Sequence, residues 1–221
     1  MGFKFFKKRN VWLPTWPVIL GLTLIIITSA SVILFSSHDF LAVTNKVPNA
    51  KILVVESWMA DNSMEQVAEI FNDEKNNYES LWLIGPRLER GYYISEKYKT
   101  YNQMGAATLI ELGIPREKIH LAPASKQLRH RTFSAAVNLK SEFEKNNIGS
   151  SPFDLVTLNV HARRSWITVK KVFGTKDQIG IIALPPVSYE AEKWMKTSAG
   201  VKSTIFESIA YLYELLTDSG R

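Results

Sequence analysis

The sequence predicts an α/β fold: a Rossmann-like, doubly wound parallel sheet of about five strands, preceded by one N-terminal transmembrane helix. Three observations support this prediction. A run of 25 residues without a charged side chain, residues 11–35, lies near the amino terminus. Beyond residue 50, short apolar runs alternate with segments of helical periodicity, as in repeated βαβ units. These short runs are continuously apolar, which is typical of strands buried on both faces of a parallel sheet.

The uncharged run is long enough to cross a bilayer, which needs about 20 apolar residues in a helix. Trp12 and Trp16 suit the headgroup interface, and four bases precede the run in residues 1–10. A cleaved signal peptide is the alternative, but its apolar core would be shorter, about 7–15 residues. We therefore expect an uncleaved single-pass anchor over residues 11–35 of a plasma (inner) membrane protein. Residues 1–10 would be cytoplasmic, residues 36–49 a polar stalk, and the main domain extracytoplasmic.

Residues 50–221 form the expected domain. Strands are predicted over residues 51–57, 80–85, 118–123, 153–160 and 179–185. Helices are predicted over residues 61–71, 95–113, 131–143 and 162–173, and a final helix or pair of helices over residues 189–217. A parallel sheet binds ligands at the carboxyl ends of its strands, so the residues after each strand are the candidates for a site.

Composition and charge exclude several function classes. The net charge is +6, but four of the 27 bases lie in residues 1–10, where no acid accompanies them. A basic tract before a membrane span is a topology signal, so we expect the lipid bilayer as a partner and no nucleic acid. The chain has no cysteine, which excludes disulfides, thiolate catalysis and cysteine-ligated zinc. Its four histidines lack tight ligand spacing, so no metal site is predicted, and the residues identify no cofactor.

The first two strands are followed by candidate groups. Glu56 ends the first strand, where a carboxylate can act as a base, accept hydrogen bonds or bind a cation. A solvated loop acid or a helix cap is the alternative. Gly85 and Arg87 follow the second strand, and glycine there lets the backbone approach a ligand closely. This loop has neither the Walker A nor the G-x-G-x-x-G pattern, and a plain surface turn is the alternative.

Basic residues stand at the starts of the helices that follow the third and fourth strands. These residues are Arg129, His130 and Arg131, ahead of the candidate N-cap Thr132, and then His161, Arg163 and Arg164. The helix dipole already places partial positive charge at a helix start, so added bases favour a bound anion there. Arginine matches phosphate or carboxylate with two parallel hydrogen bonds. The predicted ligand-binding residues are therefore Gly85, Arg87, Arg129, Arg131, Thr132, Arg163 and Arg164, with outward-facing surface arginines as the alternative.

His161 and Glu56 are the predicted catalytic residues. An unperturbed imidazole titrates at about pH 6.5, which suits proton transfer, and Glu56 would be its partner base. A structural histidine that caps the strand is the alternative for His161. We expect Glu56, Gly85, Arg131, His161 and Arg164 to converge on one crevice, because each follows a separate strand at its carboxyl end.

Several of these segments resemble the DUF218 family, which includes YdcF-, SanA- and ElyC-like proteins. The resemblance rests on VVES, GIPREKI, RHRTFSAAVNL and VTLNVHARRSW, and it covers roughly residues 50–215. His161 and Arg164 match the histidine and arginine that follow a strand in this family, while Thr132 and Asn138 match its Thr/Asn segment loosely. Two glycine-rich strand ends of the family are replaced here by Glu56-Ser57-Trp58 and by Gly85-Pro86.

Membrane-anchored members of this family are linked to cell-envelope biogenesis, and other members resemble S-adenosylmethionine binders. Together with the arginines, the resemblance implies an extracytoplasmic protein that binds or processes an anionic, phosphate-bearing envelope intermediate. A lipid-linked phosphate would suit the membrane anchor. Two alternatives stay open. One is a non-catalytic envelope scaffold, which the missing glycines favour. The other is a nucleotide or S-adenosylmethionine binder, which would need a cytoplasmic domain.

Overall fold

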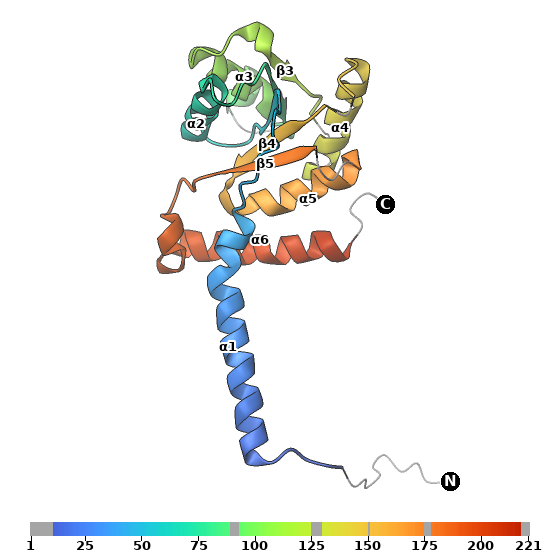
Figure 1. Ribbon diagram of the computed structural model, residues 1–221. Coiled ribbons are helices and arrows are strands. Elements are labelled where there is room, and N and C mark those ends of the chain that lie inside the picture. The colour runs from blue at the N-terminus through green and yellow to red at the C-terminus, as the bar shows by residue number, and fades with distance from the viewer. Residues whose placement is uncertain (1–10, 89–92, 125–129, 150, 175–177, 218–221) are drawn as a thin grey trace, which may run out of the picture. The chain divides into compact units, whose positions relative to one another are not determined.

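The computed structural model describes residues 11–88, 93–124, 130–149, 151–174 and 178–217 (Figure 1). The chain divides into two compact units, one ending at Ser36 and the other beginning at Ser37. The second unit is an α/β domain with helices on both sides of a central sheet.

The sheet has five strands, and all neighbouring pairs are parallel. The strands are β1 (Ile52–Glu56), β2 (Ser80–Ile84), β3 (Ile119–Leu121), β4 (Phe153–Leu158) and β5 (Ile179–Leu184). Their order is β3-β2-β1-β4-β5. The predicted doubly wound α/β fold is therefore confirmed. The strand order reverses between β1 and β4, which is the switch point at which such sheets bind ligands.

Four helices cover the two faces of the sheet: α2 (Asp61–Asn72), α3 (Tyr101–Glu111), α4 (Arg131–Lys145) and α5 (Ala162–Phe173). Successive residues of β1 point into two separate cores, as the two-residue period of a strand requires. Leu53 and Val55 pack with α2 and α3. Ile52 and Val54 pack with α4 and α5. Both faces are therefore buried, which explains why the strands are apolar at most positions and do not alternate with polar residues.

The helix predicted over residues 95–113 is two elements, a 3₁₀ turn η1 (Tyr93–Glu96) and α3. Thr100 Oγ1 accepts a hydrogen bond from the backbone N–H of Gln103 at 3.1 Å. The Gln103 side chain accepts one from the N–H of Lys99 at 2.7 Å. Because this exchange satisfies backbone donors at the helix start, α3 begins at Tyr101 and not at residue 95.

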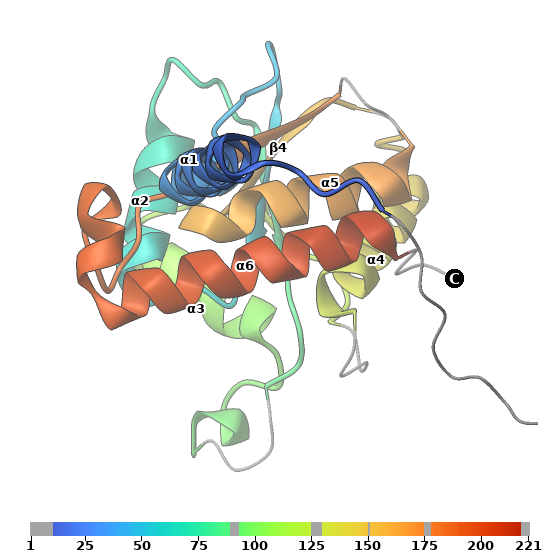
Figure 2. The same cartoon turned by 90° about the horizontal axis from the view of Figure 1, so that it is seen from below.

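The predicted final segment is a pair of elements, η4 (Ala191–Lys196) and α6 (Ser198–Leu216). Thr197 caps α6 by accepting a hydrogen bond from the N–H of Gly200 at 3.1 Å. α6 lies beside α5 (Figure 2), and it also contacts η3 (Asn159–His161), the short turn that joins β4 to α5. The last helix of the chain thus reaches the carboxyl end of β4.

The N-terminal helix α1 (Trp16–Leu41) is long and apolar enough to cross a membrane. Its carboxyl end belongs to the domain, since His38 and Leu41 are buried. Asn45 then pairs in antiparallel fashion with Ile181 on the outer edge of β5. The separate stalk expected over residues 36–49 is therefore wrong, because Leu41 inserts into the domain and the following residues pair with its sheet.

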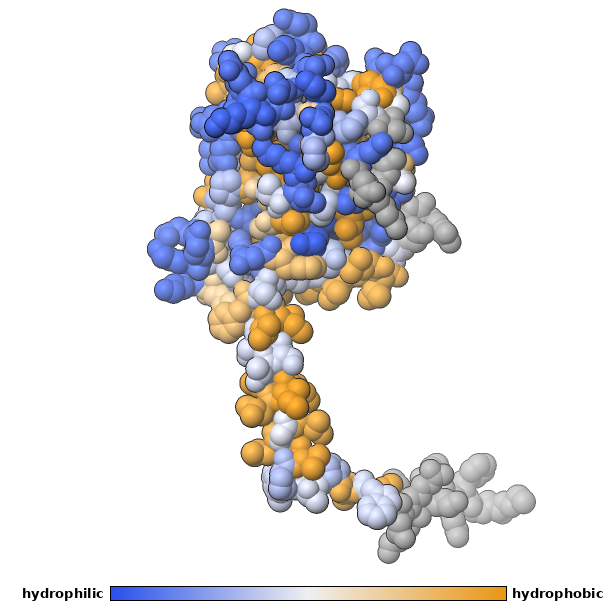
Figure 3. Space-filling model, viewed as in Figure 1, coloured by the Kyte–Doolittle hydropathy of each residue, from blue (hydrophilic) through white to orange (hydrophobic). Residues whose placement is uncertain are grey.

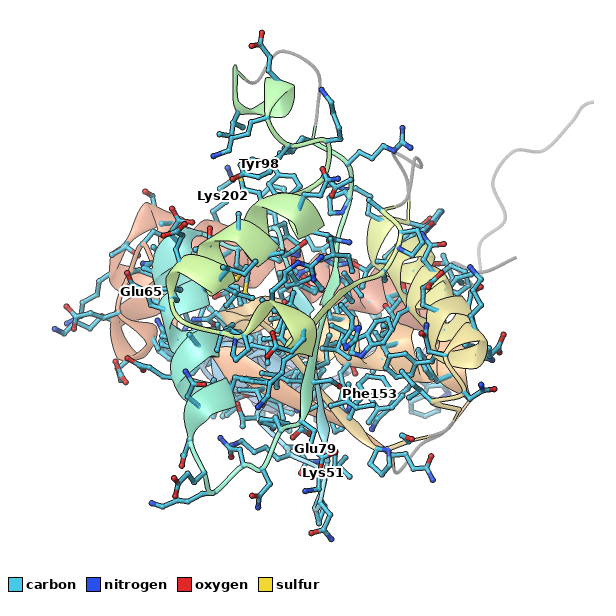
Figure 4. The ribbon with its side chains drawn as sticks, turned by 90° about the horizontal axis from the view of Figure 1, so that it is seen from above. Lys51, Glu65, Glu79, Tyr98, Phe153 and Lys202 are labelled. Atoms are coloured by element: carbon cyan, nitrogen blue, oxygen red, sulfur yellow. The ribbon has the colours of Figure 1, made fainter. Side chains whose placement is uncertain are left out.

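The amino-terminal edge of the sheet contains a buried polar cluster. Asp154 on β4 accepts hydrogen bonds from the Tyr78 hydroxyl at 2.5 Å and from the N–H of Val47 at 2.9 Å. Burial outweighs these bonds and raises the pKa of Asp154. At the same edge, Lys51 and Glu79 form an ion pair at 3.1 Å (Figure 4). These contacts tie the start of the domain to its sheet, at the end opposite to the expected ligand site.

Candidate functional site

A cavity of about 550 Å³ lies at the carboxyl ends of β1, β2 and β4. Its walls include Glu56 at the end of β1, Trp58 after β1, Gly85 after β2, Arg131 and Thr132 on α4, His161 and Arg164 after β4, and Glu207, Ala210, Tyr213 and Glu214 on α6. The cavity therefore coincides with the switch point between β1 and β4. The five residues that we expected to share one crevice all line this cavity: Glu56, Gly85, Arg131, His161 and Arg164.

Glu56 is buried at the end of β1, with 3% of its surface exposed. Its Oε2 accepts hydrogen bonds from Thr157 Oγ1 at 2.6 Å and Trp58 Nε1 at 3.0 Å. Its Oε1 accepts one from Ser165 Oγ at 2.8 Å. A buried carboxylate is costly unless it is hydrogen-bonded, and these three donors meet that need. Glu56 is thus neither a solvated loop acid nor the N-cap of α2, which is Ala60.

His161 lies between two carboxylates. Its Nε2 is 3.4 Å from Glu56 Oε2, and its Nδ1 is 3.0 Å from Glu207 Oε1. Nδ1 also lies 2.8 Å from Nη2 of Arg164. The ring meets Trp58 edge to face, with centroids 5.3 Å apart. These contacts fix the orientation of the imidazole, which both a proton-transferring histidine and a structural histidine require.

Arg164 binds a carboxylate of the same chain. Its Nε donates to Glu207 Oε2 at 2.8 Å, and its Nη2 donates to Glu207 Oε1 at 3.1 Å. This is the two-pronged geometry that arginine favours with carboxylates. The anion at the start of α5 is therefore a side chain from α6. Arg164 also lines the cavity, and its predicted role in binding an external anion stays a prediction.

The pKa values of this pair follow from its contacts. Burial alone would raise the pKa of Glu207, but hydrogen bonds with His161 and Arg164 outweigh it and lower the pKa to about 2. Burial alone would lower the pKa of Arg164, but its hydrogen bonds and attraction to Glu207 raise it. Both groups are therefore charged at neutral pH.

The amino end of α4 faces the cavity through Arg131, Thr132 and Phe133. The prediction of Thr132 as N-cap is wrong, because the helix begins at Arg131. The preceding His130 has a left-handed backbone, with φ 51° and ψ 41°, and its side chain forms no capping hydrogen bond. First-turn N–H groups have no partner within a helix, and the dipole adds partial positive charge. With the exposed Arg131 beside them, this end of the cavity suits an anion.

Two other predicted ligand residues lie away from the cavity wall. Arg87 is exposed, and its backbone pairs with Thr100. The Arg163 guanidinium lies 3.9 Å from the centre of the Phe40 ring, and its Nε donates to the Phe40 carbonyl. Successive helical residues point about 100° apart, so Arg163 and Arg164 do not face the same point. Arg129 lies outside the described residues.

Gly85 lines the cavity, but its missing side chain serves internal packing. A Cβ atom there would collide with Ser57 Oγ and lie 2.9 Å from Asn102 Oδ1. The Ser57 hydroxyl donates to Asn102 Oδ1 at 2.5 Å, and Asn102 Nδ2 donates to the carbonyl of Ala122 at 2.6 Å. Gly85 therefore leaves room for a buried hydrogen-bond chain that joins the ends of β1 and β3 through α3.

The residues that sequence reasoning does not reveal come mainly from α6. Glu207 joins His161 to Arg164, and Glu214 accepts a hydrogen bond from Lys171 Nζ at 2.9 Å. The two acids are seven residues apart, about two helical turns, and so share one face of the helix. They are the only charged residues between positions 203 and 217. Two isolated acids in an otherwise uncharged helix were the sequence signal that could have pointed to them.

Within the described part of the chain, no group of three or more His, Asp or Glu side chains could hold a metal ion. Comparisons of the chain with models of protein families, with curated proteins and with solved structures give no match.

Proposed function

We propose that this chain is a membrane-anchored protein of the cell envelope whose extracytoplasmic domain binds a phosphate-bearing ligand in the cavity. The amino end of α4, which faces the cavity beside Arg131, carries the proposal. First-turn N–H groups and the helix dipole together make a site for phosphate. The guanidinium of Arg131 adds a charged donor that matches phosphate oxygens.

The charges around the cavity favour Arg131 over Arg164 as the residue that binds the anionic group of the ligand. Glu207 neutralises Arg164, and Glu214 is paired with Lys171. Arg131 carries a full charge at the edge of the cavity and is exposed to an incoming ligand. The anionic group of the ligand would therefore lie against α4 and not against α5.

The membrane supplies the context for this ligand. α1 is long and apolar enough to cross a bilayer, and the bases in residues 1–10 favour a cytoplasmic amino terminus. A lipid-linked phosphate carried in that bilayer would be available to a domain anchored beside it. The resemblance to membrane-anchored DUF218 proteins supports the same assignment.

We further propose that His161 transfers a proton to or from the bound ligand. The side chain lies on the cavity wall, and Glu56 and Glu207 hold its ring in place from two sides. A positioned imidazole of this kind accelerates a reaction by about 10²–10⁴-fold when it acts as a general acid or base.

A non-catalytic scaffold is the second candidate, and the cluster itself favours it. His161 and Arg164 both bond to Glu207 within the chain, which is also how a purely structural polar cluster behaves. His161→Gln separates the two functions. Proton transfer predicts that the variant stays folded but fails to restore envelope function in cells that lack the protein. A scaffold predicts that it restores function fully.

Ligand binding is tested by the melting temperature of the full chain in detergent, measured in inorganic phosphate and in chloride at equal ionic strength. Binding at a hundredfold excess over the dissociation constant adds about 2.7 kcal/mol of stability. Phosphate also stabilises proteins nonspecifically, so specific binding has to be recognised by comparing variants with the wild type. Arg131→Gln should lose most of the gain, whereas Arg87→Gln, which alters an exposed arginine off the cavity wall, should keep it. An equal gain in wild type and Arg131→Gln would refute the proposal.

A further inference from the structure

The outer face of α6 is strongly apolar. Six of its side chains are between 41% and 85% exposed: Ile205, Phe206, Ile209, Leu212, Leu215 and Leu216. We call these six residues the apolar face of α6. Figure 3 shows orange, apolar residues gathered along this side of the domain. A surface helix of a soluble domain normally turns polar side chains to the solvent, so this face indicates a missing partner.

Charged residues are absent from this face. Only Glu207 and Glu214 are charged between positions 203 and 217, and they bond to Arg164 and Lys171 on the domain side. α2 shows the usual arrangement in the same protein, since its exposed positions include Asp61, Glu65 and Glu69. An apolar face with no charged rim along four turns is suited to a hydrocarbon boundary.

The position of α6 along the chain indicates what covers the face. The candidate span is continuous with residues 37–41, which belong to the domain. Phe40 is 45% exposed and packs edge to face against Tyr211 of α6, with ring centroids 5.4 Å apart. Ser36 and Phe40 are four residues apart in one helix, about 6 Å along its axis. Along the chain, a residue that touches α6 is therefore only four residues from the end of the unit that contains most of the candidate span.

From this continuity we infer that α6 is an interfacial helix that docks on the same bilayer as α1. Its apolar face would lie at the boundary between headgroups and acyl chains, as amphipathic interfacial helices do. Two exposed lysines, Lys196 and Lys202, lie before and within its first turns and suit anionic headgroups. Because the opposite side of α6 carries Glu207 and Glu214, one helix would separate the cavity from the membrane surface. The inference rests on the part of the proposed function that places α1 across a bilayer.

The absence of cysteine permits a direct test with single-cysteine variants of the full chain. Ile209→Cys and Leu212→Cys place an environment-sensitive fluorophore on the apolar face. Ile26→Cys places it in the middle of α1, and Glu65→Cys places it on the exposed side of α2 (Figure 4). Each protein is reconstituted into vesicles of phosphatidylcholine and phosphatidylglycerol, with nitroxide-labelled lipids as quenchers. All four positions are exposed, so the substitutions leave the core of the domain unchanged.

Docking predicts blue-shifted emission at positions 209 and 212, with the strongest quenching by nitroxides near the headgroup. The Glu65→Cys probe should show neither effect, and the Ile26→Cys probe should be quenched by nitroxides deep in the bilayer. Water-like emission at 209 and 212 with deep quenching at 26 would overturn the docking alone. A blue shift without lipid quenching, growing with the ratio of protein to lipid, would assign the face to a second copy of the chain and also overturn it. Failure of deep quenching at 26 would instead overturn the anchor, and the proposed function with it.

Discussion

Replacing Glu207 by glutamine should destabilise the domain in a way that depends on pH. The variant keeps the shape of the side chain but leaves Arg164 without its carboxylate partner. In the folded protein the pKa of Glu207 falls from 4.5 to about 2. A shift of one pKa unit corresponds to about 1.4 kcal/mol, so the ionised carboxylate contributes about 3 kcal/mol at neutral pH.

The pH window follows from the direction of the shift. The folded-state pKa of Glu207 lies below its unfolded value, so its contribution is complete above pH 4.5 and is lost as the pH falls towards about 2. The assay is urea unfolding of the full chain in detergent, followed by tryptophan fluorescence. The difference in unfolding free energy between wild type and Glu207→Gln should be about 3 kcal/mol at neutral pH and should shrink through this window.

The matched control is Glu192→Gln, an exposed carboxylate on η4. Surface substitutions of this kind usually change stability by less than about 0.5 kcal/mol. Subtracting the wild-type and variant curves removes the other carboxylates, which titrate in both proteins. A difference that is constant with pH, or no larger than that of Glu192→Gln, would refute the account of the His161–Arg164–Glu207 cluster.

Three further substitutions test the packing around the site and the sheet by the same unfolding assay. Tyr78→Phe removes a donor to buried Asp154 and should cost about 1–3 kcal/mol; an unchanged midpoint would contradict the role of that hydrogen bond. Gly85→Ala forces a methyl group against Ser57 and Asn102 and should cost about 1–3 kcal/mol, whereas Gly21→Ala, with nothing within 4 Å of the new methyl, should be neutral. Leu139→Ala empties a fully buried position between α4 and the sheet and should cost about 2–5 kcal/mol of stability. A smaller loss would mean that the core between the sheet and helices α4 and α5 is loosely packed.

The fold could be predicted because its signals are local. The strands are mostly apolar, and α5 carries a clear helical periodicity, so α5 was placed at its observed residues 162–173. Boundaries set by side chains were harder to place. The start of α3 depends on the Thr100 and Gln103 bonds, and the end of α1 depends on Leu41 finding a buried position in the domain.

The candidate site could be predicted only where strand ends determine it. Glu56 ends β1, and His161 and Arg164 follow β4; topology alone brings those strand ends together. The partner of Arg164 could not be found in this way, because Glu207 lies 43 residues further along and reaches the site only when α6 packs beside α5. The same limit applies to Arg163, whose contact with Phe40 spans 123 residues. Long-range packing therefore decided which arginine faces the cavity and which charge it meets.

The cavity is proposed to bind a phosphate-bearing ligand at the amino end of α4. This binding is tested most directly by native mass spectrometry of the full chain, extracted gently from the membrane of the producing cell, with the bound molecules then identified by fragmentation. The account predicts a phosphate-bearing molecule on the wild-type protein and its loss from Arg131→Gln, with retention on Arg87→Gln. An uncharged ligand, or a phosphate-bearing one retained equally by Arg131→Gln, would contradict it.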